Sequence, residues 1–222
     1  MAIQKLKKLL PLLGLFLLPA CSTNVFVKGD YPTPLTKEIP YKVGVVFDQD
    51  FSEYTFTRDK IEINLGDAQT RMYDNLFQGM FANSTTLESK ESVDGQDMVI
   101  IPKVEEVQIA TPKDNRLKVY EVWIKYNMQV FDSEGNSIAD WLMTCYGKTP
   151  TATLKSKATA LNLASVVALR DAGARMATGF VRVPEVQGWL IRQAGKAGAD
   201  SDAPAQEATS PNTNTSTSEG QT

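Results

Sequence analysis

Few residues in this chain have types and spacings suited to catalysis, because the sequence contains no histidine. Histidine is the most frequent general base and a leading zinc ligand, so its absence excludes Ser-His and Cys-His catalytic arrangements. Two pairs of acids remain as candidates for the carboxylate chemistry of glycoside hydrolases, Asp48 with Asp50 and Glu105 with Glu106. Neighbours on a strand point to opposite faces, so Glu105 and Glu106 pair poorly. Asp48 and Asp50 share a face but follow a strand in a polar turn, which favours solvated loop acids.

Two side chains, a serine and a cysteine, are candidate nucleophiles. Ser156 lies between two lysines in "TLKSKAT", where a Ser-Lys nucleophile is conceivable but the basic start of a helix is the simpler interpretation. Cys145 lies in the strand-like stretch "ADWLMTCYGK", where we expect a small buried hydrophobe, with a reactive or intermolecular thiol as the alternative. The sequence contains no CxxC, no HExxH and no GxxxxGK[ST]. We therefore predict a protein that is not an enzyme and holds no cofactor and no metal.

The first twenty residues have the pattern of a secretory signal. Lys5, Lys7 and Lys8 form a positive start, and residues 9–18 form an almost wholly apolar run of about ten residues. A helix that crosses the bilayer core needs about 20 apolar residues, so this run is too short for a transmembrane anchor. We predict a signal peptide over residues 1–20.

The segment ends in Leu18-Pro19-Ala20-Cys21, which resembles the bacterial lipobox, although Pro19 stands where Ala or Ser is more common. In that family the cysteine sulfur takes a diacylglycerol, the signal is cut before it, and the new amino terminus is acylated, with chains such as palmitate. The resemblance implies that Cys21 is the lipidation site and anchors the protein to a membrane; several chains give a stable anchor, at about 0.8 kcal/mol per buried CH₂. Asp after the cysteine usually marks inner-membrane retention in Gram-negative bacteria. Ser22 therefore implies the periplasmic face of the outer membrane.

The composition of the residues after the signal peptide divides the rest of the chain into three parts. We predict a lipidated cysteine with a proline-rich, extended tether over 21–40, a single α+β periplasmic domain over 41–194, and a disordered polar tail over 195–222. Loss of the three lysines of the signal peptide takes the formal charge from −3 to −6. Nucleic-acid binders carry basic patches, so nucleic acid is not an expected partner.

The spacing of apolar residues predicts the helices and strands of the domain. Apolar residues alternate in "YKVGVVF", and they recur at helical spacing over 67–82 and 157–180. A strand interrupted at Pro102 precedes a hairpin with the turn "DSEGNS", and Pro184 opens a short last helix. The order predicts an α+β fold: a small antiparallel or mixed sheet with two main helices packed on one face.

The two faces of the hairpin differ in composition. One face carries Tyr120 and Tyr126 in a row of apolar residues, and the other carries Trp123 among Glu121, Lys125 and Asn127. We regard Tyr120 and Trp123 as possible contacts to a partner, because exposed aromatics can be interface anchors. A second core layer under a helix would explain Trp123 equally well.

The pattern "YKVGVVFDQDFSEYTF…NLGDAQTRMYDNLFQGMF" and the β-α-β-β-β-α order after a lipid anchor resemble envelope lipoproteins. These include the lipopolysaccharide-assembly lipoprotein, auxiliary lipoproteins of lipid-transport ABC systems, and proteins with a domain like the N-terminal domain of the Tol translocation protein. The resemblance covers about residues 41–180. It implies a non-catalytic accessory or assembly factor of an envelope transport or secretion complex, with an envelope protein as partner. A carrier module for lipid or glycan and an anchored carboxylate-dependent hydrolase are the alternatives.

Overall fold

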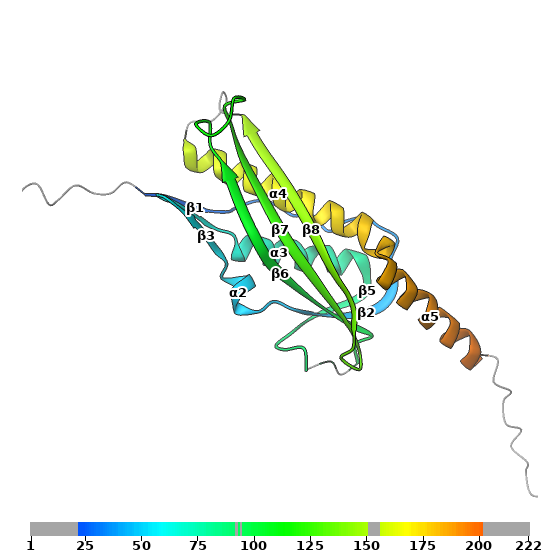
Figure 1. Cartoon of the computed structure of the whole chain (residues 1–222). Coiled ribbons are helices and arrows are strands. Elements are labelled where there is room, and N and C mark those ends of the chain that lie inside the picture. Colours follow the sequence, from blue (N-terminus) through cyan, green and yellow to red (C-terminus); the bar gives the residue numbers. More distant parts are fainter. Residues whose placement is uncertain (1–21, 92, 94, 151–155, 202–222) are drawn as a thin grey trace, which may run out of the picture. The chain divides into compact units, whose positions relative to one another are not determined.

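The computed structural model describes residues 22–91, 93, 95–150 and 156–201 (Figure 1). Within these ranges the chain forms an α+β fold, as predicted. The elements are β1 (Thr23–Phe26), β2 (Ile39–Val46), α2 (Gln49–Ser52), β3 (Thr55–Arg58), β4 (Ile61–Asn64), α3 (Gly66–Met80), β5 (Phe81–Leu87), β6 (Met98–Ala110), β7 (Val119–Asp132), β8 (Ser137–Pro150), α4 (Lys157–Gly179), η3 (Phe180–Arg182) and α5 (Pro184–Ser201).

The main sheet is mixed and has the strand order β5-β2-β6-β7-β8. Its centre and one edge are antiparallel, because β6, β7 and β8 follow one another as a meander. β2 pairs in parallel with both β5 and β6, so the chain must cross over between β2 and β5, and α3 lies in that crossover. A second, three-stranded sheet has the order β1-β4-β3.

Helices α3 and α4 cover one face of the main sheet, as Figure 1 shows. We call this the inner face and the opposite one the outer face. Alternate residues of β7 fill the inner face and are fully or almost fully buried: Val122, Ile124, Tyr126, Met128 and Val130. α4 lies very close to β8 at Gly147, where an added Cβ would stand 2.0 Å from the carbonyl oxygen of Ala164. The small residues on α4 permit this approach.

The sequence predicted both main helices and the hairpin. The expected ranges 67–82 and 157–180 became α3 and α4, with ends that differ by two residues or fewer. The hairpin turn contains Gly135 at φ +82°, a conformation that glycine adopts at low cost. Pro102 lies within β6 rather than at its end, but β6 pairs with β2 only from Met98 to Ile100. The donor that proline lacks is therefore not needed on that side.

The prediction of an extended tether over 21–40 is wrong for its described part. β1 pairs in parallel with β4, and Val25, Val27 and Tyr31 are buried. Because these side chains gain more from burial than the proline-rich segment gains from remaining extended in water, the segment packs on the domain. The remaining residues of this segment, 27–38, which we call the strap, cross α3 and α4 before β2 begins.

Two compact units divide the chain after Gln187, and the described part of the second consists of residues 188–201 of α5. The last helix was expected to be short, yet α5 continues to Ser201, past the boundary placed at 194. Residues 202–222 of the predicted tail lie outside the described residues.

Candidate functional site

The structure gives Asp48 a local structural role. Its carboxylate accepts a hydrogen bond of 2.9 Å from the backbone N–H of Phe51 and so caps the N-terminus of α2. Its second oxygen lies 3.2 Å from Nζ of Lys103, and Asp50 lies in the first turn of the same helix. The pair Asp48 and Asp50 is thus placed at a helix start rather than across a substrate cleft.

The other candidate acids and Ser156 are also accounted for by their local structure. Glu105 and Glu106 are exposed at a bulge of β6 between Val104 and Glu106. Ser156 is the N-cap of α4, and its Oγ accepts from the backbone N–H of Thr159 at 3.1 Å. Among the described residues, no group of three or more acids and cysteines is placed to hold a metal ion.

Cys145 is buried and forms no disulfide with any described residue, which confirms the expected small buried hydrophobe. Burial raises the pKa of the thiol to about 12, and the Asp171 carboxylate adds to the rise. A thiol with this pKa is almost entirely protonated at neutral pH, and the thiolate is the reactive form. The geometry therefore gives Cys145 no reactive role.

Cys21 lies outside the described residues, but the structure starts immediately after it. Strand β1 begins at Thr23, two residues beyond the predicted lipid attachment point. Two residues span at most about 7 Å of extended chain. A lipid on Cys21 would therefore hold the domain close to the membrane surface, without the spacing of tens of ångströms that a tether would give.

The two predicted partner contacts lie on opposite faces of the sheet. Tyr120 has the parity of the buried inner row of β7, where it is half-buried, whereas Trp123 is half-buried on the outer face. The structure therefore does not bring them together on one surface. Because α4 contacts β7 and β8 from the inner face, Trp123 is not packed beneath that helix.

Trp123 belongs to an aromatic and polar group on the outer face. Its ring centroid lies 5.3 Å from that of Tyr146 on β8, and the Tyr146 hydroxyl donates to Glu121 at 2.6 Å. Burial and, next, the hydrogen bond to Glu121 raise the pKa of Tyr146 to about 12. A shallow hollow of about 150 Å³ adjoins Trp123, lined also by Glu106, Gln108, Lys125 and Thr144. We call Glu121, Trp123 and Tyr146 the outer-face cluster.

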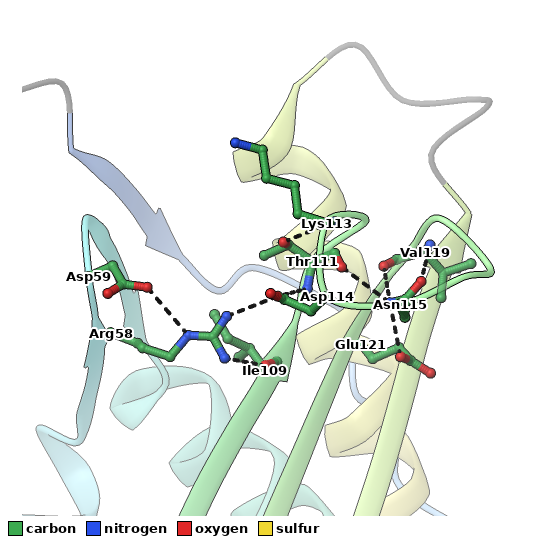
Figure 2. A network of polar contacts seen from close by, with 9 residues as sticks. All are labelled: Arg58, Asp59, Ile109, Thr111, Lys113, Asp114, Asn115, Val119 and Glu121. Atoms are coloured by element: carbon green, nitrogen blue, oxygen red, sulfur yellow. Dashed lines mark hydrogen bonds and ion pairs between the residues drawn. The ribbon is translucent and has the colours of Figure 1, made fainter.

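Figure 2 shows how a polar network holds one end of this cluster. The Nδ2 of Asn115, in the β6–β7 loop, donates to Glu121 and to the carbonyl of Val119. Arg58 of β3 donates to the carbonyl oxygen of Ile109 at 2.6 Å and to Asp114 at 3.2 Å, and so ties the small sheet to the same loop. The network fixes the loop beside the strand that carries the cluster.

Asp114 is the charged acceptor of this loop. Its carboxylate accepts from the backbone N–H of Thr111 at 2.7 Å, and this bond is the main cause that lowers its pKa, with Arg58 contributing less. An ionised Asp114 therefore stabilises the loop conformation throughout the neutral pH range.

A second feature, which the sequence analysis missed, is a cleft where the strap crosses the helices. Asn75 of α3 donates to the carbonyl of Tyr31 at 2.6 Å, and Arg170 of α4 donates to the carbonyl of Asp30 at 3.0 Å. An apolar pocket of about 330 Å³ adjoins a second pocket of about 610 Å³ here. We call the second one the polar pocket because Asp30, Arg71, Asn75 and Arg170 line it, although much of its wall is apolar. The aromatic residue within the proline-rich "YPTP" was the available signal that this segment packs on the domain.

Comparisons with known proteins bear on the fold. No protein-family model and no curated protein matches this chain. A crystal structure of a Xanthomonas campestris protein assigned to the DUF330 family matches with a TM-score of 0.50 and 11% identity, covering 80% of this chain and 99% of that one.

Two further solved structures match with lower scores. A Helicobacter pylori homologue of a neuraminyllactose-binding hemagglutinin has a TM-score of 0.46 at 9% identity, over 78% of this chain and 100% of that one. A minor lipoprotein from Acinetobacter baumannii has a TM-score of 0.38 at 12% identity, over 64% and 90%. At such identities, the Xanthomonas protein shows a common fold and nothing about activity.

Proposed function

We propose that this protein is a lipid-anchored, non-catalytic accessory or assembly factor of an envelope transport or secretion complex. The observation that carries the proposal is the lipobox-like Leu18-Pro19-Ala20-Cys21 placed directly before a folded domain that begins at Thr23. The lipid acts as the anchor and the domain works at the membrane surface. Ser22 favours the periplasmic face of the outer membrane in a Gram-negative cell. Among the described helices, none is both long and apolar enough to span a bilayer.

The outer-face cluster is the surface we assign to a protein partner. Large aromatic side chains that lie half-exposed and are held rigidly lose little entropy on binding, which suits them to anchor an interface. Trp123 packs against Tyr146 with the two rings tilted by 37°, and the Tyr146 hydroxyl is held in turn by Glu121. Leu142, 55% exposed on β8, extends this surface with an apolar side chain.

Two observations support a non-catalytic role. Asp48, the leading candidate for carboxylate chemistry, is engaged in a helix cap and an ion pair, and Ser156 is engaged in a second cap. An anchored carboxylate-dependent hydrolase would need the Asp48 carboxylate for chemistry, and a Ser-Lys nucleophile would need the Ser156 hydroxyl. Replacement of Asp48, Asp50 and Glu105 by their amides is therefore expected to leave biological function intact, and a selective loss of function would favour the hydrolase.

The proposal is tested in cells of a Gram-negative host with two measurements. Wild-type protein should incorporate labelled palmitate and fractionate with the outer membrane, whereas Cys21→Ser should do neither. A photo-crosslinking residue at position 123 or 142 should capture an envelope protein. The same residue at exposed Thr178, on α4, is the matched control. Equal capture from position 178, or release of unacylated wild-type protein, would contradict the proposal.

A carrier of lipid or glycan is the second candidate, and it was expected to need a cavity between the sheet and the helices. Tyr126 and Tyr73 occupy that layer in edge-to-face contact at 5.4 Å, and both are fully buried. A carrier function would therefore have to use a different part of the molecule. The cleft at the strap is the region with suitable shape.

A further inference from the structure

The strap builds a two-part cleft against α3 and α4. The apolar part, about 330 Å³, is lined by Pro32, Pro34, Met72, Leu76, Gly173 and Ala177, among others. The polar part, about 610 Å³, shares Tyr31, Pro32 and Arg170 with it. Both volumes are within the range of small-molecule sites, about 300–1,000 Å³.

Side chains fix the strap over the helices, so the cleft is preformed. Asn75 and Arg170 hold the backbone of Asp30 and Tyr31, and Thr36 donates to the carbonyl of Gly79 at 3.1 Å. Tyr31 is only 7% exposed, and its ring anchors the strap. A ligand would meet walls that need little rearrangement, which lowers the entropic cost of binding.

The polar part carries two guanidinium groups. Arg170 uses two of its five N–H donors on the carbonyl of Asp30, which leaves three for a ligand. Arg71 lines the same pocket and forms no ion pair with a described residue. The Asp30 carboxylate is the one acid in this lining, and Arg170 contacts its carbonyl rather than its carboxylate.

Other charged groups on the packed elements lie outside the polar pocket. On α4, Arg175 is held by Asp171 at 2.8 Å, and on α3, Asp74 accepts from Gln78 at 3.0 Å. The polar pocket therefore presents two cations against one acid, directly beside a slot that is lined mainly by apolar side chains.

We infer that this cleft binds an anionic phospholipid, with an acyl chain in the apolar part and the phosphate between Arg71 and Arg170. The charge of the polar part selects the anionic head, and arginine binds phosphate through paired N–H donors. The apolar part buries the chain away from water, which is favourable in proportion to the apolar area buried. The inference depends on the proposed anchoring only for the supply of lipid, because a domain held at the membrane meets phospholipid at high local concentration.

The test uses purified full-length chain carrying Cys21→Ser, so that no lipid is attached covalently. It is mixed with phosphatidylcholine vesicles that contain phosphatidylglycerol with a diazirine in one acyl chain. Irradiation should label peptides of the strap, α3 and α4. The double variant Arg71→Gln, Arg170→Gln should reduce labelling by at least about tenfold, because loss of a single charge-assisted hydrogen bond already gives about that factor.

The matched control is Arg175→Gln, an exposed arginine of α4 outside the cleft, which should label within about twofold of the parent, as expected for a surface ion pair. Ala177→Phe narrows the apolar part and should lower labelling while both arginines remain. Its melting temperature is checked beside that of the parent.

Three results would overturn the inference. Equal labelling from diazirine phosphatidylcholine would show that the cleft does not distinguish an anionic head group from a zwitterionic one. Equal losses in the Arg175→Gln control and the double variant would show a general charge effect. Binding of inorganic phosphate at the two arginines without any photolabelling of the strap, α3 and α4 would show an anion site without a lipid. None of these results bears on palmitate incorporation or partner capture in cells, so failure here is distinguishable from failure of the proposed function.

Discussion

Successive side chains of β7 alternate between the inner and the outer face of the sheet, and the two faces differ in how deeply they bury these side chains. On the inner face, Tyr126 and Met128 are fully buried, and the Tyr126 hydroxyl donates to Gln69 at 2.9 Å. On the outer face, Trp123 and Lys125 remain half-buried at the rim of a hollow. The inner face therefore carries most of the packing that stabilises the fold, while the outer face holds side chains in fixed positions that a partner can reach.

Residues that stabilise the fold can therefore be told from residues that contact a partner by the face on which they lie. Substitutions on the inner face should change the free energy of unfolding, and those on the outer face should change binding.

Met128→Ala should have the largest effect. Met128 is fully buried on the inner face, and truncation of such a side chain leaves a cavity that costs about 2–5 kcal/mol of unfolding free energy. Leu142→Ala is the control on the exposed side of β8, and it should change stability by less than about 0.5 kcal/mol. Urea unfolding followed by circular dichroism measures both. Equal losses in the two variants would remove the distinction between the faces.

Gly147→Ala should destabilise the protein by overpacking. The new Cβ would lie 2.0 Å from the Ala164 carbonyl oxygen and 2.4 Å from the Ala168 nitrogen, so α4 would have to move away from β8. Such changes typically cost about 1–3 kcal/mol. Gly173→Ala, on α4, is the control: its Cβ meets only the flexible Met72 sulfur at 3.3 Å, and the gain in helix propensity should leave stability equal or higher. A loss in both variants would argue against this close approach as the cause.

Tyr126→Phe tests the buried polar chain of the inner face. Gln69 is fully buried; it accepts from Tyr126 and donates to the carbonyl oxygen of Phe51 at 2.5 Å. Loss of the hydroxyl leaves the Gln69 oxygen without this partner, which should cost about 1–3 kcal/mol. Tyr146→Phe removes a hydroxyl from the half-exposed outer face, where water can replace it at Glu121. Unfolding midpoints should therefore fall clearly only for Tyr126→Phe.

The elements that sequence reasoning predicted are those whose own side chains repeat with a clear period. α3 and α4 show helical spacing, and the β7–β8 hairpin shows strict alternation around Gly135. β5 was missed because "ANSTT" has few apolar residues, and it is a strand because it pairs in parallel with β2. Such pairing depends on tertiary context more than on the strand's own residues.

The cleft could not be predicted in the same way. Arg71 and Arg170 come from different helices and meet only because α3 and α4 pack side by side under the strap. For the outer face, the alternation of side chains along β7 already placed Tyr120 and Trp123 on opposite faces. The structure adds that Tyr146 is the aromatic residue beside Trp123.

Alkaline pH should lower the free energy of unfolding through titratable groups that are buried at the inner face. Burial raises the pKa of Cys145 to about 12 from a usual value of 9.0, and it also raises the pKa of Tyr73 and Tyr126. Because the folded state holds these protons more tightly, their full contribution to stability is present below the unfolded pKa values and is lost as pH rises toward the folded ones. For Cys145 the loss between pH 8 and pH 10 should be about 1 kcal/mol. Cys145→Ala should show a flatter dependence of the urea midpoint on pH, and an unchanged slope would exclude this thiol as a cause.

Trp123→Ala should destabilise the domain less than Met128→Ala does, while it should lower partner capture steeply. The side chain is half-buried and its ring packs at a tilt against that of Tyr146, and an aromatic pair contributes about 0.5–1.5 kcal/mol beyond its buried area. The melting temperature should therefore fall less than for Met128→Ala, while capture by a photo-crosslinking residue at position 142 should fall steeply, because interface aromatics often carry much of the binding energy. Trp123→Phe keeps a ring beside Tyr146 and should retain part of the capture. If Trp123→Ala instead unfolded the domain as strongly as Met128→Ala, the outer face would be a second core layer, and the partner surface would have to be sought elsewhere.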